Sequence, residues 1–226
     1  MHTTFTLYTK SGPGGTSAAG SAKPSCRQNH GPGRPREFDM DEALDQAMET
    51  FWIHGYHATS INDLSLSMGL TKGSLYKAFK DKKAIFLAAF ERYVSGSVLG
   101  NFEQDLAAKR PPLELIQTLL VHYARISATA RGTKGCLVTA TAMEMLPHDP
   151  DIAKSVAAAL GRIHDFLLTA LRLGKQDGSL TAELDAQAAA LFLLCVIQGM
   201  RVVGKTAPKV QALRQVVQLA MRTIST

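Results

Sequence analysis

Residues 55–86 read GYHATSINDLSLSMGLTKGSLYKAFKDKKAIF, and this stretch predicts two short helices separated by a turn that contains Gly69. Ser60 is placed to cap the first helix, with Asp63 in the position that completes a capping box. Thr71 is placed to cap the second helix. A helix-turn-helix of this kind presents the N-terminal residues of its second helix to a DNA major groove.

The same helices belong to a longer pattern over residues 51–86, FxxxGYxxTSxxDL followed by GLTKGSLYxxFxxKxxxF. This pattern resembles the DNA-binding domain of the TetR family of bacterial transcriptional regulators over roughly residues 37–90. Just before it, Arg34-Pro35-Arg36 resembles the basic arm that often precedes that domain. The resemblance implies an all-α protein, with an N-terminal three-helix DNA-binding domain joined to a larger helical domain for ligand binding and dimerisation.

The composition is that of a globular chain of 226 residues, of which 46% are hydrophobic. The three cysteines, Cys26, Cys136 and Cys195, are widely spaced and form no CxxC pair, which argues against a disulfide framework or a zinc site. The longest apolar run, residues 188–197, is about half of what a bilayer requires, and no signal-peptide pattern precedes it. We therefore expect a cytoplasmic protein with no membrane segment, metal or cofactor.

The net charge of +6 depends mainly on the first 36 residues, which hold five basic residues and no acid. This segment is rich in Gly, Ser, Pro and Thr and has no apolar periodicity, so we expect a disordered basic tail. It is either a segment without function or an arm whose Arg34 and Arg36 contact the DNA minor groove. The predicted domains are thus 1–36, 37–82 for DNA binding, and 83–226 for ligand binding and dimerisation.

Every long segment after the tail has helical spacing, and no useful length alternates with period two. The helices are expected over residues 39–55, 61–67, 71–79, 81–108, 113–129, 134–146, 151–174, 185–203 and 208–224. The first helix is acidic and would repel DNA, so it should support the helix-turn-helix and not contact the duplex. The small core should contain Phe51, Trp52, Ile61, Leu64, Leu75 and Phe79.

The expected DNA contacts centre on the second helix of the motif. Its exposed positions would carry lysines for guanine edges and hydroxyls for bases or phosphates, while a glycine would permit close backbone approach. By resemblance to the family, a tyrosine of this helix and a lysine at the start of the next helix contact phosphates. The full set is Arg34, Arg36, Thr59, Ser60, Thr71, Lys72, Gly73, Ser74, Tyr76, Lys77 and Lys82. The alternative for the exposed positions is an ordinary solvated helix face.

The last two predicted helices suggest assembly, because the segment 186–203 is apolar around most of its circumference. In the TetR family the final two helices of each subunit form a four-helix dimer interface, and residues 185–224 are similar in position and pattern. The alternative is a core helix within one chain. A two-fold dimer also fits the half-site spacing of a palindromic DNA operator.

The family resemblance further implies a pocket for a small-molecule inducer of unknown identity. The candidate lining residues are Tyr93, Phe102, Tyr123, Cys136, Met143, Phe166 and Met200. Cys136 lies near Arg131 and Lys134 at a helix start, which favours a reactive thiolate, so it is either a redox or electrophile sensor or a small structural residue. A metal held by Cys136, His122 and His164 would require a coincidence of folding.

Two other functions compete with a ligand-responsive regulator, which in this family is most often a repressor. One is an enzyme with Cys136 as nucleophile and His122 or His164 as base, although no recognised catalytic motif accompanies them. The other is a DNA-binding protein without sequence preference.

Overall fold

Local capping signals fix where several of the helices begin. In the computed structural model, which describes residues 39–97 and 99–225, Ser60 and Asp63 form the predicted capping box, with Ser60 Oγ 3.1 Å from the Asp63 amide. The side chain of Thr71 accepts from the Ser74 amide, and Asp185 caps a later helix. These predictions are confirmed, and they set the directions in which the helices leave their turns.

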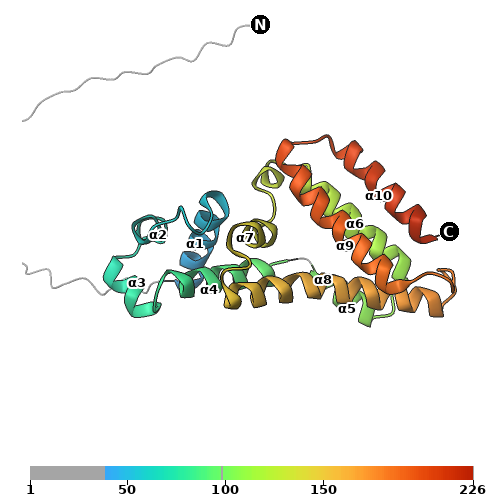
Figure 1. Ribbon diagram of the computed structural model, residues 1–226, viewed down its shortest axis with the longest axis horizontal. Coiled ribbons are helices and arrows are strands. Elements are labelled where there is room, and N and C mark those ends of the chain that lie inside the picture. Colours follow the sequence, from blue (N-terminus) through green and yellow to red (C-terminus); the bar gives the residue numbers. More distant parts are fainter. Residues whose placement is uncertain (1–38, 98, 226) are drawn as a thin grey trace, which may run out of the picture. The chain divides into compact units, whose positions relative to one another are not determined.

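Helices are the regular structure of the described residues, with no strand among them, so the all-α prediction is confirmed. Figure 1 shows the helices in chain order. They are α1 (Met40–His54), α2 (Ile61–Ser67), α3 (Lys72–Ala78), α4 (Lys82–Ser95), α5 (Leu99–Ala107), α6 (Pro112–Ser127), α7 (Leu137–Met145), α8 (Pro150–Gln176), α9 (Ala186–Val203) and α10 (Val210–Ser225), with the short 3-10 helices η1 (Ala130–Lys134) and η2 (Gly204–Thr206).

Two of the predicted helices differ from the structure. The single helix expected over residues 81–108 is divided, because Ser95, Gly96 and Ser97 favour turns over helix and end α4 at Ser95. The helix expected from Lys134 begins at Leu137, because Gly135 adopts a φ of 80° that ends η1 first. Both differences shape the cavity described below.

Two hydrophobic cores lie along the described chain. The first joins α1–α4 to α7 and the beginning of α8, and in it Phe51, Leu64 and Leu75 are almost completely buried. Trp52 is buried as well, while Ile61 and Phe79 pack against this core half-exposed. The second core lies among α5, α6, the rest of α8, α9 and α10. The long α8 takes part in both cores (Figure 1), so the helix-turn-helix is packed onto the body of the protein by continuous apolar contact.

Candidate functional site

The helix α3 is fixed from beneath and leaves its other side open. Leu75 is 1% exposed and anchors α3 against the first core, while the Thr71 cap fixes its first turn. Three side chains of α3, Lys72, Tyr76 and Lys77, extend into solvent without a hydrogen bond or ion pair to any described residue. We call these three the α3 surface. Two cations and a phenol free to bind an anionic partner are suited to DNA phosphates and base edges.

Gly73 lies in the first turn of α3, where no contact with a described residue requires a glycine. A Cβ atom added there would meet only Thr71 Oγ1, at 3.8 Å. Since glycine costs roughly 1 kcal/mol relative to alanine inside a helix, stability does not explain the residue. Close approach of the backbone to a ligand remains as a reason for it.

Thr59 does not lie where the sequence suggested. Its side chain is 1% exposed, and its hydroxyl donates to the Gly55 carbonyl at 2.6 Å. The expected contact of this side chain with DNA is therefore wrong, because burial keeps its hydroxyl from the surface. Ser60, Thr71 and Ser74 are exposed, but their hydroxyls serve the caps of α2 and α3.

Lys82 is also engaged within the chain. Its ammonium donates to the carbonyls of Tyr56 (3.0 Å) and Thr59 (2.9 Å) and lies 4.4 Å from the Tyr56 ring centroid. This lysine braces the turn between α1 and α2, and a phosphate contact would have to share its charge with that role. Arg34 and Arg36, and the predicted tail as a whole, lie outside the described residues.

Three of the four acidic residues of α1 form ion pairs, which fits the supporting role expected of this helix. Arg92 of α4 binds Asp41 (2.9 Å) and Asp45 (2.8 Å), and its hydrogen bond holds the pKa of the Asp45 carboxyl below the ordinary value. Lys134 forms an ion pair with Glu49. These pairs attach α1 to α4 and η1, and their positive partners reduce the repulsion that α1 would otherwise exert on DNA.

Glu144, which the sequence analysis missed, joins α7 to the DNA-binding module. Its carboxylate accepts from the backbone amides of Tyr56 (2.9 Å) and His57 (2.7 Å). The neighbouring Gly55 has a φ of 81°, and a Cβ atom there would lie 2.8 Å from a Glu144 carboxylate oxygen. Here the glycine is required by both its backbone conformation and the close approach.

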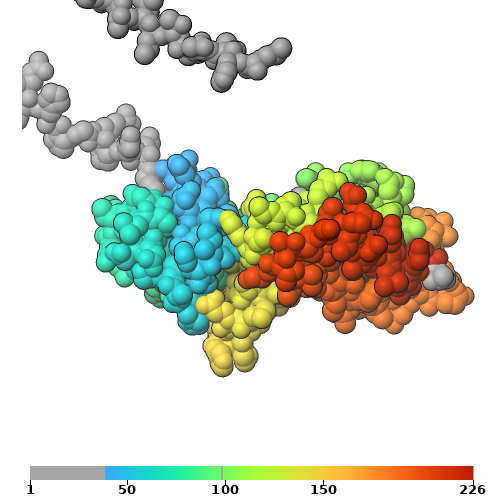
Figure 2. Space-filling view, turned by 90° about the horizontal axis from the view of Figure 1, so that it is seen from above, coloured from blue at the N-terminus to red at the C-terminus, as the bar shows by residue number. Residues whose placement is uncertain are grey.

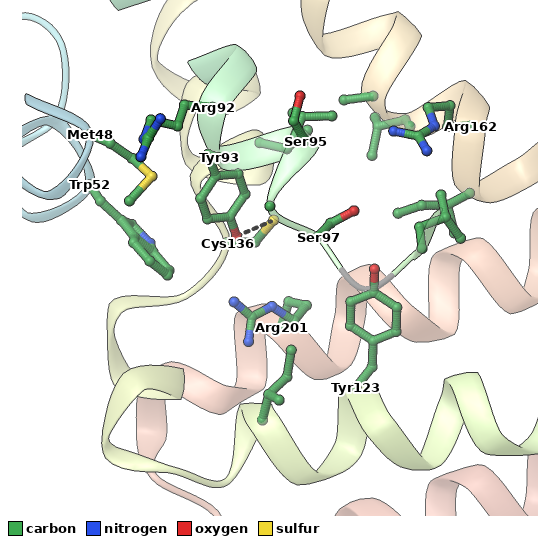
Figure 3. Close-up of a pocket in the computed structure, with 18 of the residues that line it drawn as sticks. Met48, Trp52, Arg92, Tyr93, Ser95, Ser97, Tyr123, Cys136, Arg162 and Arg201 are labelled. Atoms are coloured by element: carbon green, nitrogen blue, oxygen red, sulfur yellow. Dashed lines mark hydrogen bonds between the residues drawn. The ribbon is translucent and has the colours of Figure 1, made fainter. Parts of the chain in front are cut away.

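A cavity of about 670 Å³ lies beside the first core, enclosed by residues of α1, α4, α6, α7, α8 and α9 (Figure 3). Of the seven predicted lining residues, Tyr93, Tyr123 and Cys136 line it. The others do not: Phe102, Phe166 and Met200 are buried in the second core, and Met143 is 79% exposed. The helical period of α7 turns Thr141 and Met145 inward, so Met143 faces solvent.

Two tyrosines and a cysteine line this cavity. The Tyr93 hydroxyl lies 3.8 Å from Cys136 Sγ, close enough to donate to the sulfur. Burial raises the pKa of Tyr93 and raises that of Tyr123 to about 12, so both remain protonated at neutral pH. His122 also lines the cavity, and burial, together with the charges of Arg125 and Arg201, lowers its pKa.

The alternatives that involved histidine gain no support from this geometry. His164 pairs with Asp165 at 3.2 Å and does not line the cavity, whereas His122 does. Within residues 39–97 and 99–225, neither histidine hydrogen-bonds to Cys136, and no group of three metal-ligating side chains occurs. The cavity is thus mainly a binding volume with aromatic walls.

The helices α9 and α10 leave large apolar side chains in solvent. Leu191 is 55% exposed and Leu219 is 66% exposed; Phe192, Val202, Val203 and Val216 are exposed as well. We call these six residues the C-terminal apolar face. Figure 2 shows α10, in red, spread over the surface of the C-terminal half. By length and composition alone, the segment Ala186–Thr206 could cross a membrane. The uninterrupted run of ten apolar residues seen in the sequence is only part of this longer apolar segment.

Two protein-family models match this chain, one over the DNA-binding module and one over the C-terminal helices. The model of "Bacterial regulatory proteins, tetR family" matches residues 43–89, and that of "Tetracyclin repressor-like, C-terminal domain" matches residues 112–220. The transcriptional repressor ComR of Escherichia coli is 31% identical over 193 residues, which cover 84% of this chain and 90% of ComR. The regulator YezE of Bacillus subtilis is 30% identical over 71% of this chain and 83% of its own length.

A solved structure extends the similarity to three dimensions. The TetR family regulator CifR, a cysteine mutant complexed with a 26bp operator duplex, has a TM-score of 0.73 and 30% identity over 85% of this chain and 100% of its own. FadR of Bacillus subtilis in complex with stearoyl-CoA has a TM-score of 0.65 at 20% identity, which shows the fold alone.

Proposed function

Because this chain belongs to the TetR family of bacterial transcriptional regulators, and is a DNA-binding regulator and not an enzyme, we propose that it represses transcription as a homodimer. In this proposal the dimer binds a palindromic operator, and a small molecule that enters the cavity releases it. The protein would act in the cytoplasm, where the bacterial chromosome lies.

The observation that carries the proposal is the α3 surface. Lys72, Tyr76 and Lys77 are free of partners within the described chain, on a helix whose cap and buried Leu75 hold it rigidly. A preorganised surface loses little freedom on binding DNA, and its lysines release counterions from the phosphates. The operator complex of CifR, a relative with the same fold, supports DNA as the partner of this surface.

The C-terminal apolar face supports the homodimer. Six large apolar side chains on α9 and α10 stay exposed in a single chain, although burial of such area is worth roughly 25 cal/mol per Å². A second copy would cover them with the same face, as two-fold symmetry requires. The two α3 surfaces of the dimer would then meet two half-sites separated by about one helical turn of DNA, or a multiple of it.

The cavity supports control by a ligand. Its volume lies in the range of small-molecule sites, and its walls come from α1 and α4 of the DNA-binding side of the chain and from α6, α8 and α9 of the C-terminal region. A ligand that binds better when the two α3 surfaces are wrongly spaced would release the operator. A coupling of about 1–3 kcal/mol would change operator affinity by about 5- to 150-fold.

The proposal is tested by selection from a random pool of duplexes, followed by binding assays at several salt concentrations. A regulator should enrich one palindrome and prefer it over random DNA by at least about a thousandfold. Enrichment of no sequence, with a steep salt dependence on every duplex, would instead establish a DNA-binding protein without specificity.

A second candidate for the signal is chemical modification of Cys136. Its sulfur lines the cavity, is only half-buried, and accepts from the Tyr93 hydroxyl, so an electrophile entering the cavity would reach it. N-ethylmaleimide or hydrogen peroxide should then release the operator from the wild type and leave Cys136→Ser bound. Cys195 is exposed, so Cys195→Ser is the matched control and should respond like the wild type. A wild type that keeps its operator under both reagents would exclude thiol sensing.

A further inference from the structure

We propose that the cavity binds an anionic, amphipathic small molecule, with its acidic group paired to Arg201 and its apolar part against the aromatic walls. This inference rests on the proposed role of the cavity as the inducer site and names the chemical class of the inducer. The argument begins with a charge that the fold buries.

Arg201 is 5% exposed, and it is the one charged residue of α9. Its guanidinium donates to the carbonyl of Gly135 and lines the cavity. Among residues 39–97 and 99–225, no carboxylate forms an ion pair with it. A buried cation without a counter-anion is costly to maintain, since removing a charge from water is repaid only by a partner.

The groups around Arg201 do not provide a negative charge. Tyr93 and Tyr123 both feel its charge, yet burial dominates and keeps their pKa values raised, so they remain neutral phenols. His122 has a lowered pKa and remains neutral as well. Figure 3 shows Arg201 near Tyr93, Tyr123 and Cys136.

The remaining charges of the cavity leave the balance positive. Arg92 and Arg162 line it, but Asp45 neutralises the first and Glu103 the second. Asp45 is the one carboxylate among the described lining residues. Arg131 stacks over the Trp52 ring at 5.1 Å and has no acidic partner in the described chain. An entering anion would therefore meet two arginines that are not neutralised.

Trp52 lines the same cavity. The indole Nε1 of Trp52 is buried and makes no hydrogen bond in the described chain, although such groups normally find an acceptor. The ring itself forms one wall, 5.0 Å from Tyr93 in an edge-to-face contact. A carboxylate or sulfonate offers several acceptors to the Arg201 guanidinium, while its apolar part contacts the rings.

The test uses two fluorescent probes of nearly equal shape, anilinonaphthalene sulfonate and the neutral phenylnaphthylamine. Arg201→Gln should weaken binding of the sulfonate by at least about tenfold and change that of the neutral probe by less than about threefold. Arg162→Gln, which removes a cavity charge already paired with Glu103, is the matched control and should leave both affinities within about twofold. Equal losses of both probes in Arg201→Gln, or no loss of either, would overturn the proposal.

Two further variants guard against misfolding and against an internal partner. Arg201→Lys keeps the charge and should restore most of the preference for the sulfonate. Cys136→Ser removes the thiol of the cavity and should leave that preference unchanged; a marked increase would show that a thiolate already neutralises the guanidinium in the wild type. If the Arg201 variants do not fold, wild-type melting with naphthoate and naphthamide decides, and a larger stabilisation by the neutral amide contradicts the proposal.

Failure of this inference is separable from failure of the proposed function. Probe binding is measured without DNA, and operator release is measured with the same probes in a second experiment. Anion binding through Arg201 without operator release would keep the site and remove its regulatory role. Operator release by neutral molecules alone would keep the regulator and overturn the assignment of ligand class.

Discussion

The α3 surface and the C-terminal apolar face both consist of side chains that a single chain leaves exposed, but the two sets differ in the free energy of their exposure to water. Lys72 and Lys77 are well solvated, so an empty α3 surface costs little. Leu191 and Leu219 gain about 1.5–3 kcal/mol each when they are fully buried. A well-solvated surface can bind and release its partner, whereas an apolar surface should stay buried against one. DNA binding and assembly are thus assigned to chemically distinct surfaces.

The largest effect is expected where the apolar face is broken. Leu219→Glu places a charge on that face, and since Leu219 is 66% exposed, the single chain should still fold. Burial of the carboxylate between two copies would be unfavourable, so the protein should sediment as a monomer and lose operator affinity by about a hundredfold or more. Gln218→Glu adds the same charge beside the face and should remain dimeric. A dimeric Leu219→Glu with full operator affinity would place the interface elsewhere.

The next effect should arise on the α3 surface itself. Lys72→Ala removes an exposed cation that makes no hydrogen bond or ion pair with a described residue, so the thermal unfolding temperature should stay nearly unchanged. Loss of a base contact would cost about 1–3 kcal/mol, or roughly 5- to 150-fold in operator affinity. Arg172→Ala, an exposed change of equal charge on α8, is the control for net charge. Equal losses in the two variants would show that Lys72 acts only through overall charge.

A smaller effect is expected from the hydroxyl of Tyr76. Tyr76→Phe keeps the ring, which is 57% exposed, and removes one hydrogen-bonding group. We expect operator affinity to fall by about 2- to 10-fold, the worth of a single hydrogen bond, with an unchanged melting temperature. Affinity measured by fluorescence anisotropy that does not change would reduce Tyr76 to a solvated side chain.

What the sequence revealed depends on how far apart the interacting residues are. The caps at Ser60, Thr71 and Asp185 involve neighbours within three positions, so the helix starts were predicted correctly. The contact of Glu144 with Tyr56 spans 88 positions, and no local signal announces it. Whether a helical face meets a cavity or solvent depends on packing, so the prediction for Met143 was wrong.

The cavity was only partly visible in the sequence for the same reason. Aromatic residues at helical spacing predict burial, which Tyr93 and Phe166 share, but only the first of them lines the cavity. Arg201 did leave a signal, a lone charge in an otherwise uncharged helix of 18 residues. A charged side chain is buried only where other groups interact with it. For Arg201 these groups include the Gly135 carbonyl and Tyr123, which come near α9 only in the folded chain.

Glu144 belongs to neither the α3 surface nor the C-terminal apolar face. Its substitution therefore tests whether the packing beneath the DNA-binding module can be weakened while both surfaces remain intact. Glu144→Gln keeps the shape and removes the charge that strengthens two backbone hydrogen bonds. The free energy of unfolding should fall by about 1 kcal/mol. Hydrogen exchange should quicken at the amides of Tyr56 and His57 before any change at α10. Unchanged exchange at both amides would show that the carboxylate is dispensable for the α1–α2 turn.

The smallest change sharpens the assignment of the α3 surface, because it should move stability and DNA binding in opposite directions. Gly73→Ala adds one methyl group, and its nearest neighbour in the chain is Thr71 Oγ1 at 3.8 Å. Alanine favours the helix, so the free energy of unfolding should rise by about 0.5–1 kcal/mol. Operator affinity should nonetheless fall, because the methyl group would occupy space that the DNA backbone needs. A variant that gains stability and keeps full affinity would place the DNA farther from the first turn of α3 than the α3 surface implies.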